Sequence, residues 1–373
     1  MESRYARIND EELAILRKRI GIEVPRQQPH IERISKDAIR HFVYGIGDTN
    51  PLWTDEEYAR KSRYKTIIAP PCILYSTDLI ASGNVGGLPG VHAMFAGTNW
   101  EWFLPVKLGD HIIGSSYLSR LEEKRSEFAG RTFLQGYETV FRNQAQEIVA
   151  RAESFCIRSE RDTAREKGKY KAITRQSYTD EQLKAIETDY DREEVRGAQP
   201  RYWEEVDCGD ELTPIVKGPL TITDMLAWLM GWGGLFIRAH RRGLEYRLRH
   251  PAAALPDPYG IPDVPERVHW DNDFARQVGA PAAYDYGPQR ISWLGQLMTN
   301  WMGDDGFLRK LEVEVRRFNI VGDTTWCRGK VINKYLQDGS PMVECQVWAE
   351  NQRGETTAQG KALVLLPGKN KFE

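Results

Sequence analysis

The run Leu52-Trp53-Thr54-Asp55-Glu56-Glu57-Tyr58-Ala59-Arg60 returns in altered form as Val268-His269-Trp270-Asp271-Asn272-Asp273-Phe274-Ala275-Arg276. Both runs read apolar residue, two variable residues, Asp, two polar residues, aromatic residue, Ala and Arg. A second match follows, because Leu108-Gly109-Asp110 corresponds to Val321-Gly322-Asp323. Trp53 and Asp110 are 57 positions apart, and His269 and Asp323 are 54 apart. Self-similarity of this kind predicts two copies of one fold.

Each copy is expected to contain an early helix, a loop that carries the repeated run, and long antiparallel strands. The helices are predicted over residues 34–48 and 221–234, where apolar residues recur at helical spacing. The strands include residues 111–124 and 145–158 in the first copy, then 324–336 and 356–367 in the second. One helix against a curved antiparallel sheet, duplicated, is an α+β fold. The alternative is a strand-rich sandwich, and the two helices count against it.

The polar stretch 161–200 is interpreted as a linker with one solvated helix. We therefore expect a first domain over residues 1–160 and a second over 201–373. A further short amphipathic helix is predicted over residues 8–20.

Composition narrows the class of protein. The chain has 51 basic and 53 acidic residues, so its net charge of −2 favours neither nucleic acid nor an anionic membrane as a partner. Its first residues are too charged for a signal peptide, and no apolar run has the length of a membrane span. Five dispersed cysteines without a CxxC pair indicate reduced thiols rather than a zinc site, and we expect a cytoplasmic protein.

The stretch Tyr44-Gly45-Ile46-Gly47-Asp48-Thr49-Asn50-Pro51-Leu52 resembles the hydratase motif of the MaoC-like dehydratases, the R-specific enoyl-CoA hydratases. The first half is similar to the N-terminal dehydratase domain of MaoC-like proteins and fungal-type fatty acid synthases, and the second to a MaoC-like domain around His269. The resemblance spans roughly residues 30–160 and 200–367. It implies a double hotdog, reversible hydration of a 2-enoyl-CoA thioester, and no cofactor besides the CoA of the substrate.

The resemblance also implies a set of site residues. In this family an Asp and a His five positions apart hold a water, an Asn between them orients the Asp, and a downstream glycine N–H polarises the thioester carbonyl. The first half retains Asp48 and Asn50, but Trp53 replaces the His, and Pro71 in the glycine position has no N–H. We expect this half to be non-catalytic, with Asp48 and Asn50 serving the turn or contacting the substrate.

The second half supplies what the first lacks. His269 aligns with Trp53, and Gly287 lies 18 residues beyond it, as Pro71 lies beyond Trp53. A histidine can serve as the acid and base, and a glycine N–H can donate to an enolate oxygen. His269 and Gly287 are therefore the predicted centre of catalysis.

The carboxylate partner of His269 is less defined. Val264 stands five positions before it, so we consider Asp263 first and Glu266 second. Asp285 is a third candidate, and it and Tyr286 are predicted to contact the substrate beside Gly287.

An insertion separates the second predicted helix from His269, and its segment 238–250 holds five Arg and two His. Guanidinium groups bind phosphate oxygens bidentately, so Arg241 and Arg242 are predicted to hold the phosphates of CoA. A solvated basic helix or a subunit contact is the alternative.

The predicted activity is that of a hydro-lyase acting on a 2-enoyl or 3-hydroxyacyl thioester of CoA. A second interpretation is a non-catalytic acyl-CoA-binding subunit that completes a partner hydratase, and a third is a hotdog thioesterase. The sequence is also compatible with a homo-oligomer.

Overall fold

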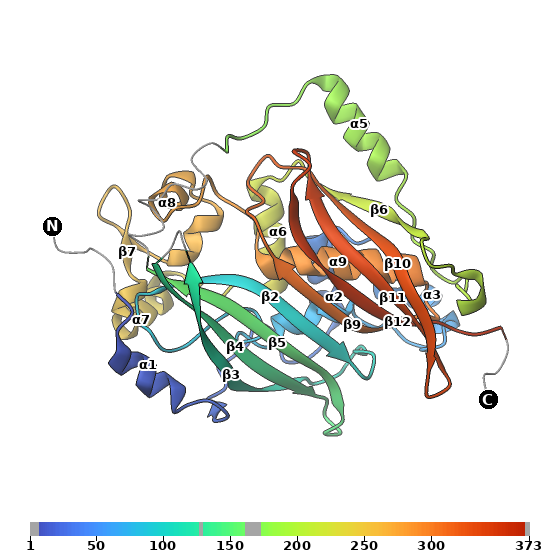
Figure 1. The fold of residues 1–373 in the computed structure, drawn as a ribbon, viewed down its shortest axis with the longest axis horizontal. Coiled ribbons are helices and arrows are strands. Elements are labelled where there is room, and N and C mark those ends of the chain that lie inside the picture. The colour runs from blue at the N-terminus through green and yellow to red at the C-terminus, as the bar shows by residue number, and fades with distance from the viewer. Residues whose placement is uncertain (1–6, 127–129, 161–172, 370–373) are drawn as a thin grey trace.

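The computed structural model describes residues 7–126, 130–160 and 173–369, and its centre is a ten-stranded antiparallel sheet (Figure 1). The strand order is β1-β3-β4-β5-β2-β9-β12-β11-β10-β6. Five neighbouring strands therefore come from each half of the chain. In the first half they are β1 (Glu23–Val24), β2 (His92–Trp102), β3 (Ile113–Ser126), β4 (Gly130–Arg142) and β5 (Ile148–Ser159), and in the second β6 (Glu211–Lys217), β9 (Phe307–Val315), β10 (Thr325–Gln337), β11 (Ser340–Asn351) and β12 (Thr356–Leu365).

The two halves join along one antiparallel pair, β2 with β9. Thr98 lies opposite Val313 and Trp100 opposite Leu311 across this seam, and all four side chains are buried. Side chains alternate between the two faces of a strand, so these residues point into the apolar core. The halves therefore share one hydrophobic core, which keeps a site between them in a fixed geometry.

The two helices predicted from the sequence are present as α2 (Lys36–Ile46) and α6 (Ile222–Trp232). Ser35 and Thr221 cap their first turns by accepting backbone N–H groups. The helices pack against each other at glycines, because a Cβ on Gly231 would lie 2.6 Å from the backbone of Phe42. Helix α9 (Gly287–Met302) lies with them on one face of the sheet (Figure 1).

Helix α9 corrects the predicted arrangement of one helix per half. Every residue from Pro288 to Met302 is buried. Ile291, Leu294 and Met298 recur at helical spacing in its sequence, but the predicted pattern of one helix per half leaves this segment out. The corresponding place in the first half holds only a short 3-10 segment, η2 (Pro71–Ser76). The second half therefore has the long central helix and the first half does not.

The repeated residues have the same structural roles in both halves. Asp55 caps α3 (Glu56–Lys61) and Asp271 caps α8 (Asn272–Gln277), each through its side-chain oxygen. Asp110 accepts the N–H of Lys107, and Asp323 accepts the N–H of Ile320 three residues earlier in the same way. The repeated residues are therefore those that cap helices and close turns in both halves. The repeat confirms that the halves share one fold.

The remaining helices lie at the edges. Helix α1 (Asp10–Arg17) is the predicted N-terminal helix, and α5 (Asp180–Asp191) lies within the polar stretch and stands outside the body near β6 (Figure 1). The insertion before His269 forms α7 (His240–Arg249), η4 (Pro251–Ala253) and the hairpin β7 (Leu255–Pro256) and β8 (Pro262–Asp263). The other short segments are η1 (Pro51–Trp53), η3 (Trp203–Glu205) and η5 (Pro265–His269). No helix in the described part of the chain has both the length and the apolarity to cross a bilayer.

Candidate active site

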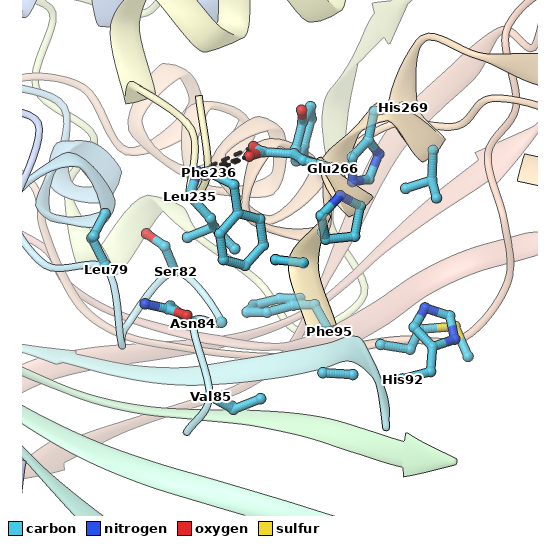
Figure 2. Close-up of a pocket in the computed structure, with 18 of the residues that line it drawn as sticks. Leu79, Ser82, Asn84, Val85, His92, Phe95, Leu235, Phe236, Glu266 and His269 are labelled. Atoms are coloured by element: carbon cyan, nitrogen blue, oxygen red, sulfur yellow. Dashed lines mark hydrogen bonds between the residues drawn. The ribbon is translucent and has the colours of Figure 1, made fainter. Parts of the chain in front are cut away.

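A cavity of about 1150 Å³ lies between the two halves, which is roomy for a small-molecule site. The first half lines it with the loop before β2 and the start of that strand. The second half lines it with the end of α6, part of the insertion, η5 and the first turn of α9. Figure 2 shows Leu79, Val85 and Phe95 on one side, with Leu235, Phe236 and His269 on the other. Both halves are therefore needed to form the site.

His269 is the last residue of η5, and its ring lines this cavity. Its Nδ1 lies 2.7 Å from the carbonyl oxygen of Tyr284. Because a carbonyl only accepts, Nδ1 carries the proton in the neutral ring, which leaves Nε2 with a free lone pair. The imidazole also stacks on the ring of Tyr286, with 3.7 Å between centroids and 26° between planes.

The electrostatic environment of His269 favours the neutral ring. Burial lowers the pKa of the imidazole to about 4, against a smaller opposing effect of the hydrogen bond to the Tyr284 carbonyl. At neutral pH the ring is therefore a base that can take a proton. The imidazolium that results is a stronger acid than that of an exposed histidine, so it readily returns that proton.

Gly287 lines the same cavity as His269 and begins α9. The first N–H groups of an α-helix have no acceptor within the helix, and the helix dipole is positive at this end. The N–H of Gly287 is thus a suitable donor for an oxygen that becomes negative. A Cβ at this position would lie 2.2 Å from Cδ1 of Phe95, so the close approach of β2 requires glycine.

Glu266 is buried in the wall of the same cavity. Its carboxylate accepts the backbone N–H groups of Leu235 and Phe236, at 3.1 and 2.7 Å, and is directed at that backbone (Figure 2). Burial raises the pKa of this carboxyl group, although the two N–H groups partly oppose the effect. Glu266 fastens the start of the insertion to η5, and no hydrogen bond joins it to His269 in the described structure.

The other two candidate carboxylates are held by other groups, although Asp285 is among the residues that line the cavity. Asp263 ends the β7–β8 hairpin, accepts the N–H of Val264 at 2.7 Å, and is absent from the residues that line the cavity. Asp285 is fully buried and forms an ion pair and two hydrogen bonds with Arg290. Arg290 in turn donates to two backbone carbonyls of the second half. The structure thus gives Asp285 an anchoring role for the start of α9 and does not bring Asp263 to His269.

In the first half, the polar side chains of the motif are occupied by hydrogen bonds within the motif itself. Asp48 accepts the N–H of Asn50 and the indole N–H of Trp53, each at 2.9 Å, and Asn50 accepts the N–H of Leu52. Trp53 and Pro71 line a separate cavity of about 30 Å³, which is the size of one water molecule. Asp48 and Asn50 line neither cavity. These two side chains stabilise a turn, and neither of them contacts the large cavity between the halves.

The basic segment reaches the main cavity through residues other than those predicted. Arg241 and Arg242 are exposed and pair with Glu245 on the same helix. Arg238 and Arg249 line the cavity instead. The sequence indicated the correct segment, but the face of α7 that turns inward depends on how the helix packs.

Sequence reasoning did not identify the aromatic surroundings of the histidine. Tyr286 was predicted to contact the substrate, and it lines the cavity with a buried hydroxyl whose pKa is raised by burial and by the nearby Glu266 carboxyl group. Its ring also meets Trp232 edge-on at 5.0 Å. A spacing pattern carries no signal for such stacking, because the three residues come from separate elements.

Comparison with known proteins agrees with this architecture. Residues 19–152 match the model of the FAS1-like dehydratase domain region. The chain superimposes on a MaoC-like dehydratase with a TM-score of 0.66 and 16% identity, over 95% of this chain and 100% of that chain. It also superimposes on a conserved hypothetical protein of Mycobacterium tuberculosis that has a double hotdog fold, with a TM-score of 0.55, 10% identity, and coverage of 92% and 94%. The chain is a double hotdog.

The double hotdog also has relatives in sequence. It is 27% identical over 135 residues to a probable enoyl-CoA hydratase alpha subunit of Thermomonospora curvata. That match covers 31% of this chain and 42% of the relative. The predicted MaoC-like resemblance and the predicted α+β double hotdog are therefore confirmed, and the first half is similar to a dehydratase region.

Proposed function

We propose that this double hotdog adds or removes water across the 2,3 bond of an acyl-CoA thioester. One observation carries the proposal. A neutral histidine with a free Nε2 and the N-terminal end of a buried helix face one cavity that both halves enclose. Hydration of a 2-enoyl thioester needs a base for water and a donor for the enolate oxygen, and this cavity supplies both.

In the hydration direction, Nε2 of His269 takes a proton from water while the water oxygen bonds to C3 of the substrate. The electron pair of the 2,3 double bond moves onto the thioester oxygen, which the N–H of Gly287 stabilises. The imidazolium then gives its proton to C2, which restores the neutral ring and completes the 3-hydroxyacyl product. The Tyr284 carbonyl and the ring of Tyr286 hold the imidazole in one orientation throughout.

The activity is tested by incubating the purified chain with trans-2-enoyl-CoA and following the loss of the conjugated thioester absorbance. The proposal expects formation of 3-hydroxyacyl-CoA and, in the reverse direction, loss of water from that product. A thiol reagent in a parallel sample detects free CoA. Release of CoA without hydration would identify a thioesterase and contradict the proposal.

A second candidate is a subunit that binds acyl-CoA and completes a partner hydratase. The observation that favours it is that no carboxylate of the described residues hydrogen-bonds to His269, since Val264 occupies the expected position and Glu266 is held by backbone N–H groups. The relative from Thermomonospora curvata is named an alpha subunit. This candidate expects binding of acyl-CoA with no turnover by the chain alone, and turnover when a partner subunit is added.

A further inference from the structure

Two arginines of the insertion face the main cavity without a carboxylate partner. Arg238 precedes α7 and Arg249 ends it, and both line the cavity. Within the described residues, neither forms an ion pair, and each donates one hydrogen bond to a backbone carbonyl, of Ile237 and Glu245 respectively. A guanidinium group has five N–H donors, so most donors of both side chains remain available to a ligand.

The acidic side chains on the cavity wall do not neutralise this pair. Asp285 is paired with Arg290, and Glu266 accepts backbone N–H groups. Arg238 lies close enough to lower the pKa of the Glu266 carboxyl group slightly against burial, which raises it, but the two groups form no ion pair. This part of the cavity therefore has a net positive charge.

Aromatic rings lie beside the two arginines. Tyr246 and His250 stack on each other, with 4.4 Å between centroids and 26° between planes, and both line the cavity. Burial raises the pKa of the Tyr246 phenol, and both Arg238 and Arg249 oppose that shift, which places their charges near its ring. A flat aromatic surface next to guanidinium groups suits a nucleobase attached to phosphates.

We infer that the insertion, through Arg238, Arg249 and the Tyr246–His250 pair, binds the phosphorylated adenosine of the substrate's CoA. The phosphates lie against the two guanidinium groups, and the adenine stacks on the aromatic pair. The acyl-pantetheine arm then runs through the same cavity to His269. This inference rests on the proposed function for the identity of the thioester. It makes the substrate a CoA ester rather than a thioester on a carrier protein, which lacks the nucleotide.

The helix that carries the site offers its own control. The double variant Arg238→Ala/Arg249→Ala removes the two cavity-facing charges, and Arg241→Ala/Arg242→Ala removes two exposed charges that are paired with Glu245. Both variants change the net charge equally. A difference between them therefore reports position rather than overall charge.

Two readouts test the inference. Binding of 3′,5′-adenosine bisphosphate is measured by calorimetry, and KM is measured for an enoyl-CoA and for the matching enoyl-pantetheine. We expect the cavity-facing variant to weaken the nucleotide and raise the KM of the CoA ester by about 10- to 100-fold, with the KM of the pantetheine ester changed less than about twofold. The exposed variant should behave like the original chain in both assays.

The outcomes separate this inference from the proposed function. Equal losses for the CoA and pantetheine esters, or unchanged binding of the bisphosphate by the cavity-facing variant, would overturn the nucleotide site. Hydration of pantetheine and CoA esters with the same KM by the original chain would overturn it too. Specific binding of the bisphosphate by a chain that hydrates no enoyl thioester would support the site while contradicting the lyase activity.

Discussion

The substitution Gly287→Ala tests the proposed contact between α9 and the substrate oxygen. The ring of Phe95 is enclosed between two glycines, because a Cβ on Gly287 would lie 2.2 Å from its Cδ1 and a Cβ on Gly83 would lie 2.7 Å from its Cδ2. Ordinary contact begins at 3.4 Å, so a methyl group at position 287 and the ring must separate by about 1.2 Å. Close packing against Gly83 prevents a simple retreat of the ring.

This separation is expected to lower both the stability of the fold and the rate of hydration. Overpacking of this kind costs about 1–3 kcal/mol of the free energy of unfolding. A displacement of roughly 1 Å at a reacting group lowers a rate by on the order of 100-fold. Since the first turn of α9 must shift or the ring must enter the cavity, we expect kcat/KM for enoyl-CoA hydration to fall by about that factor.

A second substitution identifies the cause. Phe95→Ala removes the ring that the methyl group meets, so adding Gly287→Ala to Phe95→Ala should cost far less activity than adding it to the original chain. Hydration rates and urea denaturation of the four chains give the coupling energy directly. An unchanged kcat/KM in Gly287→Ala, or an equal loss in both backgrounds, would show that the contact between position 287 and Phe95 does not control hydration.

Three further predictions concern other parts of the site. The pKa of His269 is lowered to about 4, and the neutral ring is the base. We therefore expect kcat/KM to stay level from pH 7 to about pH 5 and to fall at lower pH with a midpoint near 4. A midpoint near 6.5 would show that the ring is not desolvated. Trp53→His should create no second activity, since a cavity of only about 30 Å³ lies beside Trp53. It should lower the free energy of unfolding by about 1–3 kcal/mol, because Asp48 loses its indole donor. Hydration measured in a chain that also lacks the His269 imidazole would detect any activity gained in the first half. Asp285→Asn leaves the buried guanidinium of Arg290 without its counter-charge and should cost about 3–5 kcal/mol in urea denaturation, and a change below about 1 kcal/mol would contradict the anchoring role.

The duplicated fold could be predicted because its markers are local. Asp55 and Asp271 cap the helices that begin beside them, and Asp110 and Asp323 close turns three residues long. Such residues must recur wherever the same turn recurs, so they leave a repeat in the sequence. Helix α9 has apolar residues at helical spacing, such as Ile291, Leu294 and Met298, but the repeat offers no matching helix in the first half, where only η2 is found.

The candidate site could be predicted only in part. His269 and Gly287 keep the spacing set by the repeat, and the structure places both on one cavity wall. The carboxylates depend on contacts between distant segments, such as Glu266 with the backbone of Phe236, which no spacing encodes. The insertion breaks the register before His269, so the distance along the chain to Asp263 does not indicate distance in space.

In the proposed mechanism, Nε2 of His269 moves the proton between water and the thioester. The most direct test of this step is kcat/KM for enoyl-CoA hydration by His269→Asn, beside His269→Ala and the control His111→Ala, which lies outside the cavity. The Asn side chain retains an N–H for the Tyr284 carbonyl and lacks Nε2, so the fold should persist. We expect kcat/KM to fall by about 10²–10⁴-fold in both His269 variants and to stay unchanged in the control. Hydration by His269→Asn at the rate of the original chain would contradict this mechanism.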